Sequence, residues 1–154
     1  MTAEDKKVKE VMAKAVLSID LNTNAADASK AMAKRGVSCA VVTHVGAAVG
    51  IVTERDLVAK VLADSVDPNK VLASDIMSTP LITITSEDGV TEAASKMSEY
   101  KVRRLVVVDA DGSMVGVITA GDIARMHAEG RGYKDPMLNA LARYNEGTES
   151  GPYR

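Results

Sequence analysis

The chain carries VGIVTERDL at residues 49–57 and a second version of this stretch, VGVITAGDI, at residues 115–123. Further matches surround both stretches in the same order, for example Met32 with Met97. A repeat of this size indicates two like supersecondary units, each of which buries its apolar face only against the other. Because the two copies fill most of the 154 residues, the repeat decides the fold.

Each copy is predicted to contain a short helical lead-in, a strand, a helix, a hairpin of two strands and a closing helix. Apolar residues at helical spacing, such as Ala28 and Met32, predict the helices. The hairpin turns are expected at Val45-Gly46 and Asp111-Gly112, where the copies differ in length. After the lead-in, the expected elements are 17–20, 25–35, 39–43, 48–52 and 54–63 in the first copy, and 81–85, 89–100, 104–109, 113–118 and 120–128 in the second.

The repeat also gives the domain boundaries. The first copy is expected over residues 8–63 and the second over 71–128, with a polar linker at 64–70 that Pro68 interrupts. In the extension, residues 129–154, Asp135 can cap a short C-terminal helix and Pro136 suits its first position. The end of the chain, from Asn145, is predicted to be disordered.

Composition limits the function and the location. Nineteen basic and 21 acidic side chains give a net charge of −2, which does not favour a dedicated nucleic-acid binder. A nucleic-acid site rests only on the local run Arg125, His127, Arg131 and Lys134. With Cys39 as its one cysteine and no apolar stretch of membrane or signal length, the chain is expected to be a soluble, cytoplasmic protein.

The repeated Gly-x-x-Thr-x-x-Asp pattern lies where a strand runs into a helix, at Thr53 and Asp56 and again at Thr119 and Asp122. One interpretation is a capping box, in which Thr and Asp satisfy the unpaired N–H groups of the helix start. The other is a ligand site, because a helix start attracts phosphate and a carboxylate can accept hydrogen bonds from two vicinal hydroxyls. The duplication does not separate these interpretations.

The two copies differ just before the hairpin. The second has Arg103 and Arg104 where the first has Ser38 and Cys39. Adjacent strand residues point to opposite faces, so at least one arginine is expected on the face shared with the other copy. The planar guanidinium suits phosphate, which favours a nucleotide site in the second copy. A solvated, charged strand end is the alternative.

The duplicated unit, its Gly-hydrophobic-x-Thr-x-x-Asp signature and the lead-in VKEVM at residues 8–12 resemble the cystathionine beta-synthase (CBS) domain. Two such domains in tandem form a Bateman module. The segment KVRRLVVVD at residues 101–109 is similar to part of the gamma subunit of AMP-activated protein kinase, whose basic residues bind nucleotide phosphate. The resemblance implies an α/β (α+β) fold of two pseudo-symmetric β-α-β-β-α units packed sheet to sheet.

The same resemblance implies that AMP, ADP, ATP or a relative such as S-adenosylmethionine binds in clefts between the units. In those clefts Asp56 and Asp122 would take ribose, while Thr53 and Thr119 would take phosphate. Each cleft would borrow the lead-in and first strand of the opposite copy. The remaining expected contacts are Arg103 and Arg104 to phosphate, apolar contacts around Val117 and Ile118, Ala13 and Ser18 at the Thr119 cleft, and Ser78 and Thr83 at the Thr53 cleft.

The favoured function is therefore a stand-alone regulatory module, expected to pair into a homodimer and to control a separate enzyme or transporter. The alternatives are a dimerisation module that binds no ligand and a nucleic-acid binder. An enzyme is not expected, because His44 and His127 are the only histidines and no catalytic or metal-ligand set is visible.

Overall fold

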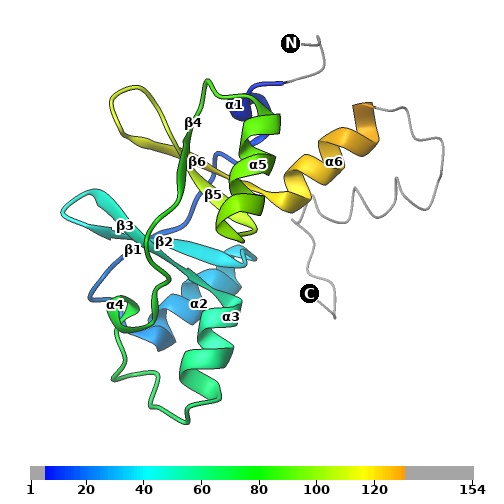
Figure 1. The fold of residues 1–154 in the computed structure, drawn as a ribbon. Coiled ribbons are helices and arrows are strands. Elements are labelled where there is room, and N and C mark those ends of the chain that lie inside the picture. Colours follow the sequence, from blue (N-terminus) through cyan, green and yellow to red (C-terminus); the bar gives the residue numbers. More distant parts are fainter. Residues whose placement is uncertain (1–5, 131–154) are drawn as a thin grey trace. The chain divides into compact units, whose positions relative to one another are not determined.

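The computed structural model describes residues 6–130, which form two compact units (Figure 1). One unit, called the Thr53 unit below, consists of residues 16–81. The other, called the Thr119 unit, combines the described residues up to 15 with those from 82 onward. The short helix expected from Asp135 and the disorder expected from Asn145 lie outside the described residues.

The Thr53 unit contains one three-stranded sheet in the order β1-β2-β3. β1 runs parallel to β2, and β2 is antiparallel to β3. The elements are β1 (Ser18–Asp20), α2 (Ala25–Arg35), β2 (Cys39–His44), β3 (Ala47–Thr53), α3 (Glu54–Leu57), the π-helix η1 (Val58–Leu62) and α4 (Ala73–Ile76).

The Thr119 unit repeats this arrangement, with a sheet in the order β4-β5-β6. β4 is parallel to β5, and β5 is antiparallel to β6. Its elements are α1 (Val8–Val11), β4 (Thr83–Thr85), α5 (Val90–Tyr100), β5 (Arg104–Val108), β6 (Met114–Thr119) and α6 (Ala120–Gly130). The predicted α/β class and the β-α-β-β-α order of each copy are confirmed.

Local sequence explains where the elements begin and end. The side chain of Asn24 accepts the N–H of Asp27 at 2.8 Å and so caps the start of α2. Gly36 ends that helix in the left-handed region, with a φ of 62°. The predicted hairpin turns are also found, with Gly46 at a φ of 80° and Gly112 at 85°.

The closing helix of the first copy departs from its prediction as one regular helix over 54–63. It starts as α3 and continues as a π-helix from Val58, in which the N–H of Ala63 bonds to the carbonyl of Val58 at 2.8 Å. The corresponding α6 is a regular helix. No helix within residues 6–130 is long and apolar enough to cross a membrane.

Each unit has its own apolar core between the sheet and the helices. In the Thr53 unit the core includes Ile19, Met32, Ala40, Val42, Val52 and Ile76. In the Thr119 unit it includes Val8, Ile84, Met97, Leu105, Val107 and Ile118. The apolar residues whose spacing predicts each helix and strand are therefore the ones that pack together in the cores.

The lead-in of each copy packs in the unit of the other copy. Ala13, which follows α1, exchanges two backbone hydrogen bonds with Val117 of β6, at 2.9 and 3.0 Å. Ser78, which follows α4, does the same with Ile51 of β3, at 2.8 and 3.3 Å. The chain therefore leaves the Thr119 unit after Ala15 and returns to it at Ile82.

The motif glycines make room for these lead-ins. A Cβ atom on Gly116 would stand 2.6 Å from the carbonyl oxygen of Ala13 and 2.7 Å from the sulfur of Met12. A Cβ on Gly50 would stand 2.6 Å from the sulfur of Met77, and its nearest neighbours are all in that side chain. Glycine at both positions thus has a structural reason that is independent of any ligand.

Gly116→Ala is expected to lower the free energy of unfolding by about 1–3 kcal/mol, the usual range for overpacking. Gly50→Ala should cost less, because the flexible Met77 side chain can turn aside whereas the backbone at Ala13 cannot. Urea denaturation of both variants measures the difference, and equal losses would contradict this explanation.

Candidate ligand-binding site

Thr53 and Asp56 form a complete capping box at the start of α3. The hydroxyl of Thr53 accepts the N–H of Asp56 at 3.2 Å and donates to its Oδ2 at 3.0 Å. Asp56 Oδ2 in turn accepts the N–H of Thr53 at 2.9 Å. The capping interpretation is therefore correct for this pair in the structure.

The carboxylate of Asp56 is bound by two further groups of its own unit. The hydroxyl of Ser78 donates to Oδ1 at 2.9 Å and lies 3.2 Å from Oδ2. Lys60, one turn along the closing helix, places its Nζ 3.0 Å from Oδ1 and also bonds to the carbonyl of Ile76 at 2.9 Å. With only 6% of the residue exposed, Asp56 is surrounded by its own chain.

These contacts decide the ionisation of Asp56. Burial is the largest single influence and would raise the pKa of the carboxyl, because it disfavours the charged form. The hydrogen bonds from Lys60, Thr53 and Ser78 together outweigh it and hold the pKa below its ordinary value. Asp56 is thus a satisfied carboxylate anion inside the Thr53 unit.

The corresponding Thr119 and Asp122 make fewer hydrogen bonds within their own unit. Asp122 Oδ2 accepts the N–H of Thr119 at 2.9 Å, and the Thr119 hydroxyl accepts the N–H of Asp122 at 3.1 Å. Asp122 Oδ1 is paired with Arg125 at 3.2 Å. At the position of Ser78 this unit has Ala13, which offers no hydroxyl. Within residues 6–130, the Thr119 hydroxyl accepts the hydrogen bond from the Asp122 N–H and donates none.

Arg104 lies directly opposite Thr119 in the pairing of β5 with β6. Opposite residues of an antiparallel pair share a face, so both side chains are on the side away from Leu105 and Ile118 in the core. The Nη1 atom of Arg104 is buried and has no hydrogen-bond partner in the described part of the chain. A buried donor without an acceptor is costly, which makes this atom a place for an acceptor from outside.

The other predicted site residues fall into different surroundings. Arg103 is exposed, and Val117 uses its backbone to pair with Ala13. Ile118 is fully buried in the core of the Thr119 unit, so its side chain serves packing. Ser18 and Thr83 lie in β1 and β4, each in the unit opposite to the site that the resemblance assigns to it, and their roles stay predictions.

The sequence does not predict Lys60 and Arg125 as partners of the two aspartates, and Arg125 enters the sequence analysis only in the basic run. The two basic residues follow Asp56 and Asp122 by four and three positions on a helix. Helix residues at these spacings are neighbours, so a basic residue there is a signal that the sequence already contains. The resemblance places Ser78 at the Thr53 site, and the structure adds its direct hydrogen bond to Asp56.

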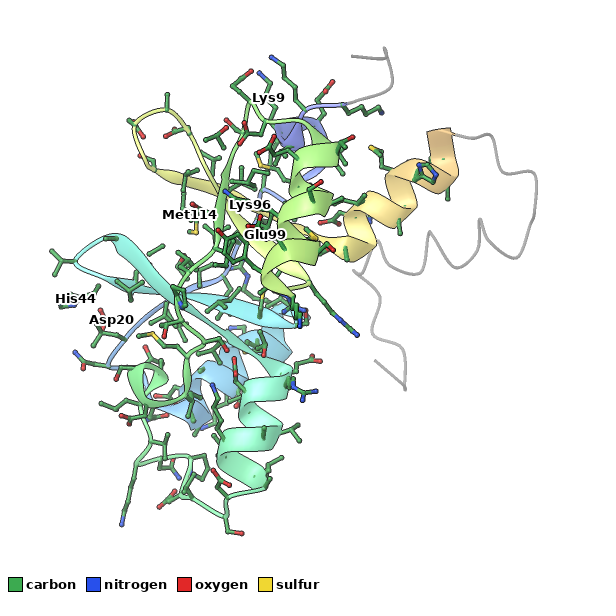
Figure 2. All side chains as sticks on the ribbon, viewed as in Figure 1. Lys9, Asp20, His44, Lys96, Glu99 and Met114 are labelled. Carbon is green, nitrogen blue, oxygen red and sulfur yellow. The ribbon has the colours of Figure 1, made fainter. Side chains whose placement is uncertain are left out.

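The two histidines lie on the surface. His44 ends β2 on the surface beside the hairpin turn, as Figure 2 shows, and His127 is exposed on α6. Among residues 6–130, no three His, Cys, Asp or Glu side chains are grouped so that they could hold a metal ion. Arg131 and Lys134 of the basic run lie outside the described residues.

The family model for the CBS domain matches residues 8–63 and again 73–129. The chain belongs to the CBS domain family. It contains two CBS domains, a CBS pair, and each copy carries the Thr and Asp pair described above.

Similar proteins agree with this assignment. The CBS domain pair of protein MJ0100, solved in complex with 5′-methylthioadenosine and S-adenosyl-L-methionine, is 30% identical and matches with a TM-score of 0.73, covering 82% of this chain and 98% of that one. The CBS domain protein PAE2072 from Pyrobaculum aerophilum, complexed with AMP, is 27% identical with a TM-score of 0.71, covering 90% and 99%.

An uncharacterized protein of Methanopyrus kandleri is 36% identical over 120 residues. The match covers 77% of this chain and 61% of that relative, so the chain spans less than two thirds of its length.

Asp56→Asn is expected to lower the free energy of unfolding at neutral pH by about 1–3 kcal/mol, because buried donors lose their charged acceptor. The stability from a lowered carboxyl pKa is complete above the unfolded-state value of about 3.9 and disappears as pH falls through the folded-state value. The gap between wild type and variant should therefore close in acid. Urea unfolding from pH 7 to pH 2 measures it.

Asp75→Asn is the matched control, since Asp75 is exposed and accepts one backbone N–H, that of Leu72. This variant should be less destabilising at neutral pH. A gap for Asp56→Asn that stays constant down to the lowest pH would show that the Asp56 charge adds nothing to stability.

Proposed function

We propose that this CBS pair is a regulatory, non-catalytic module that binds an adenine nucleotide (AMP, ADP or ATP) or a related adenosyl ligand at the Thr119 unit. The observation that carries the proposal is the buried, unpartnered Nη1 of Arg104 on the same sheet face as Thr119. A phosphate oxygen is the acceptor that best fits a guanidinium beside a free hydroxyl. The AMP complex of PAE2072 supports the proposal.

Each residue then has a defined role. Arg104 and Arg103 bind phosphate, and the Thr119 hydroxyl donates to a phosphate oxygen while it caps α6. Asp122 accepts hydrogen bonds from the ribose hydroxyls, because each carboxylate oxygen can take a second donor. The base lies against apolar groups near Val117 and the lead-in. Ala13, in the same unit, completes the proposed site.

The Thr53 unit favours a different role for its own copy of the motif. The Ser78 hydroxyl donates to Asp56 in the way a ribose hydroxyl would, and Lys60 supplies the positive charge. Cys39 replaces Arg104 opposite Thr53. We therefore propose that Asp56 and Thr53, with Ser78, mainly stabilise the unit, and that a ligand there binds more weakly.

Regulation requires that the ligand bind two states of the module with different affinity. In our proposal the states differ in the arrangement of the CBS pair within a homodimer, and the output is the activity of a separate enzyme or transporter. The alternative ligand, S-adenosylmethionine, is supported by the MJ0100 complex.

Arg104→Gln is expected to weaken AMP binding by about tenfold or more, because a hydrogen bond to a charged group contributes about 1.5–3 kcal/mol. Adenosine, which lacks phosphate, should bind wild type and variant alike. Calorimetric titration with AMP, ATP, S-adenosylmethionine and adenosine measures both effects. Arg35→Gln, at an exposed arginine of α2, is the control.

An equal loss with AMP and adenosine would contradict the phosphate role of Arg104. Absence of binding to every member of the ligand panel would overturn the proposed function and leave the module without a ligand of this class.

Asp122→Asn should reduce AMP affinity about tenfold with a small loss of stability, whereas Asp56→Asn should reduce stability and leave the main affinity unchanged. The two variants test the same motif position in the two copies. Calorimetry gives the affinity and the number of sites, and thermal unfolding gives the stability. Two equal sites per chain, or equal effects of the two variants on affinity, would contradict the proposed inequality.

A further inference from the structure

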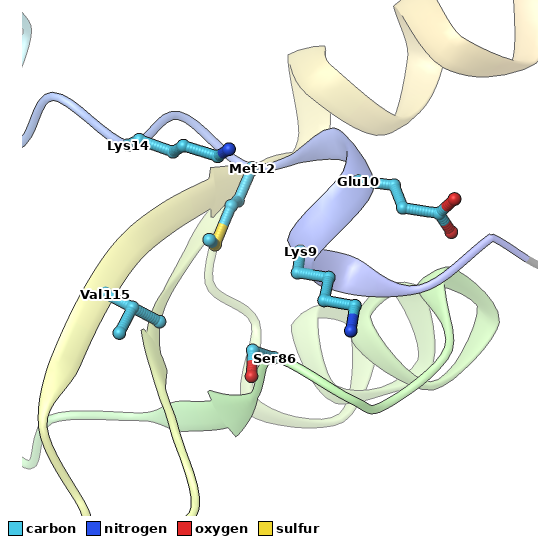
Figure 3. A pocket seen from close by; sticks show the side chains of 6 residues that line it. All are labelled: Lys9, Glu10, Met12, Lys14, Ser86 and Val115. Carbon is cyan, nitrogen blue, oxygen red and sulfur yellow. The ribbon is translucent and has the colours of Figure 1, made fainter.

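A pocket of about 540 Å³ lies within the Thr119 unit at the end of the sheet that is remote from Thr119 (Figure 3). Val115 borders it and precedes Thr119 by four residues on β6, which corresponds to about 13 Å along a strand. The pocket therefore lies along β6 from Thr119, and its lining residues Met12 and Lys14 flank Ala13, which borders the proposed nucleotide site. Its lining consists of Lys9, Glu10, Met12, Lys14, Ser86 and Val115.

The lining combines cations with an apolar surface. Met12 and Val115 pack against the core of the unit and give the pocket its apolar part. In Figure 3 the Met12 side chain extends towards the space between Ser86 and Val115, while the ammonium of Lys9 lies 2.6 Å from the carboxylate of Glu87. Two ammonium groups and a hydroxyl thus border an apolar space, an arrangement that suits a small organic anion.

The carboxylates next to the pocket do not neutralise all of the lysine charges there. Glu87 pairs with Lys9 at 2.6 Å and also with Lys7, so one negative charge serves two ammonium groups. Glu10 accepts the backbone N–H of Lys7 at 2.7 Å, and Figure 3 shows its carboxylate on the side away from Val115. Lys14 has no ion pair or side-chain hydrogen bond within the described residues.

The Thr53 unit serves as an internal comparison, because it is the same fold in the same chain. It keeps the apolar part, with Met77 in the place of Met12 and Val49 in the place of Val115. Ser74, Thr79 and Leu21 stand where the Thr119 unit has Lys9, Lys14 and Ser86. The fold therefore forms without these polar groups.

We propose that this pocket is a second ligand site, which binds a small organic anion, a carboxylate or a phosphate monoester with a short apolar chain. Lys9 and Lys14 bind the anionic group together with the Ser86 hydroxyl, and Met12 and Val115 contact the apolar chain. The pocket is an open depression of the surface, which suits a small ligand that stays partly exposed to solvent. The proposal does not depend on the nucleotide site.

The test is an NMR titration of the full chain, labelled with ¹⁵N, with butyl phosphate, butyrate and inorganic phosphate. Saturable shifts of the Met12, Ser86 and Val115 amides are expected with at least one of the two organic anions. Inorganic phosphate should bind more weakly, because it lacks the apolar chain. Sodium chloride at matched ionic strength is the control for general screening.

The double variant Lys9→Ser, Lys14→Thr gives the Thr119 unit the residues of its twin and should weaken binding about tenfold or more. Lys7→Ser is the matched control, since Lys7 shares Glu87 with Lys9 but does not line the pocket. It should retain affinity within about twofold. Shifts that do not saturate, that chloride reproduces, or that survive in the double variant would overturn the proposal.

Discussion

The pairing of each lead-in with the hairpin of the other copy is the constraint on which the rest of the structure depends. Ala13 with Val117 and Ser78 with Ile51 join segments that are far apart in the chain. The motif glycines permit this close approach. Because each lead-in runs beside the strand that ends in the Thr and Asp motif, the same pairing stabilises both units and sets the neighbours of both aspartates.

Capping and ligand binding are compatible uses of one Thr and Asp pair. Capping occupies one oxygen of each carboxylate and the acceptor side of each hydroxyl. In the Thr53 unit Ser78 and Lys60 take the remaining capacity. In the Thr119 unit Arg125 takes part of it, and the hydroxyl of Thr119 donates no hydrogen bond to any described residue. Both copies therefore share the capping hydrogen bonds, and they differ in which groups use the remaining carboxylate oxygen and hydroxyl proton.

Much of this fold follows from the sequence because its signals are local. Apolar spacing and two capping residues gave α2 its observed limits, and glycines with positive φ marked both hairpin turns. The prediction of one closing helix over 54–63 missed the π-helix after Leu57, because the shift in backbone hydrogen bonding leaves no local pattern in the sequence. The bond from Ser78 to Asp56 depends on which lead-in meets which hairpin, and that is a property of the tertiary fold.

A duplicated chain lets structural and functional needs be separated without other sequences. What both copies keep, such as the glycine under the lead-in and the capping pair, is required by the shared fold. What only one copy has is not required by the shared fold, and it serves that unit alone, as Ser78 and Lys60 serve Asp56 in the Thr53 unit. Arg104, Lys9 and Lys14 each occur in one copy only, and all three lie in the Thr119 unit. The Thr119 unit is thus the half in which ligand binding is to be sought, and the Thr53 unit supplies its internal control.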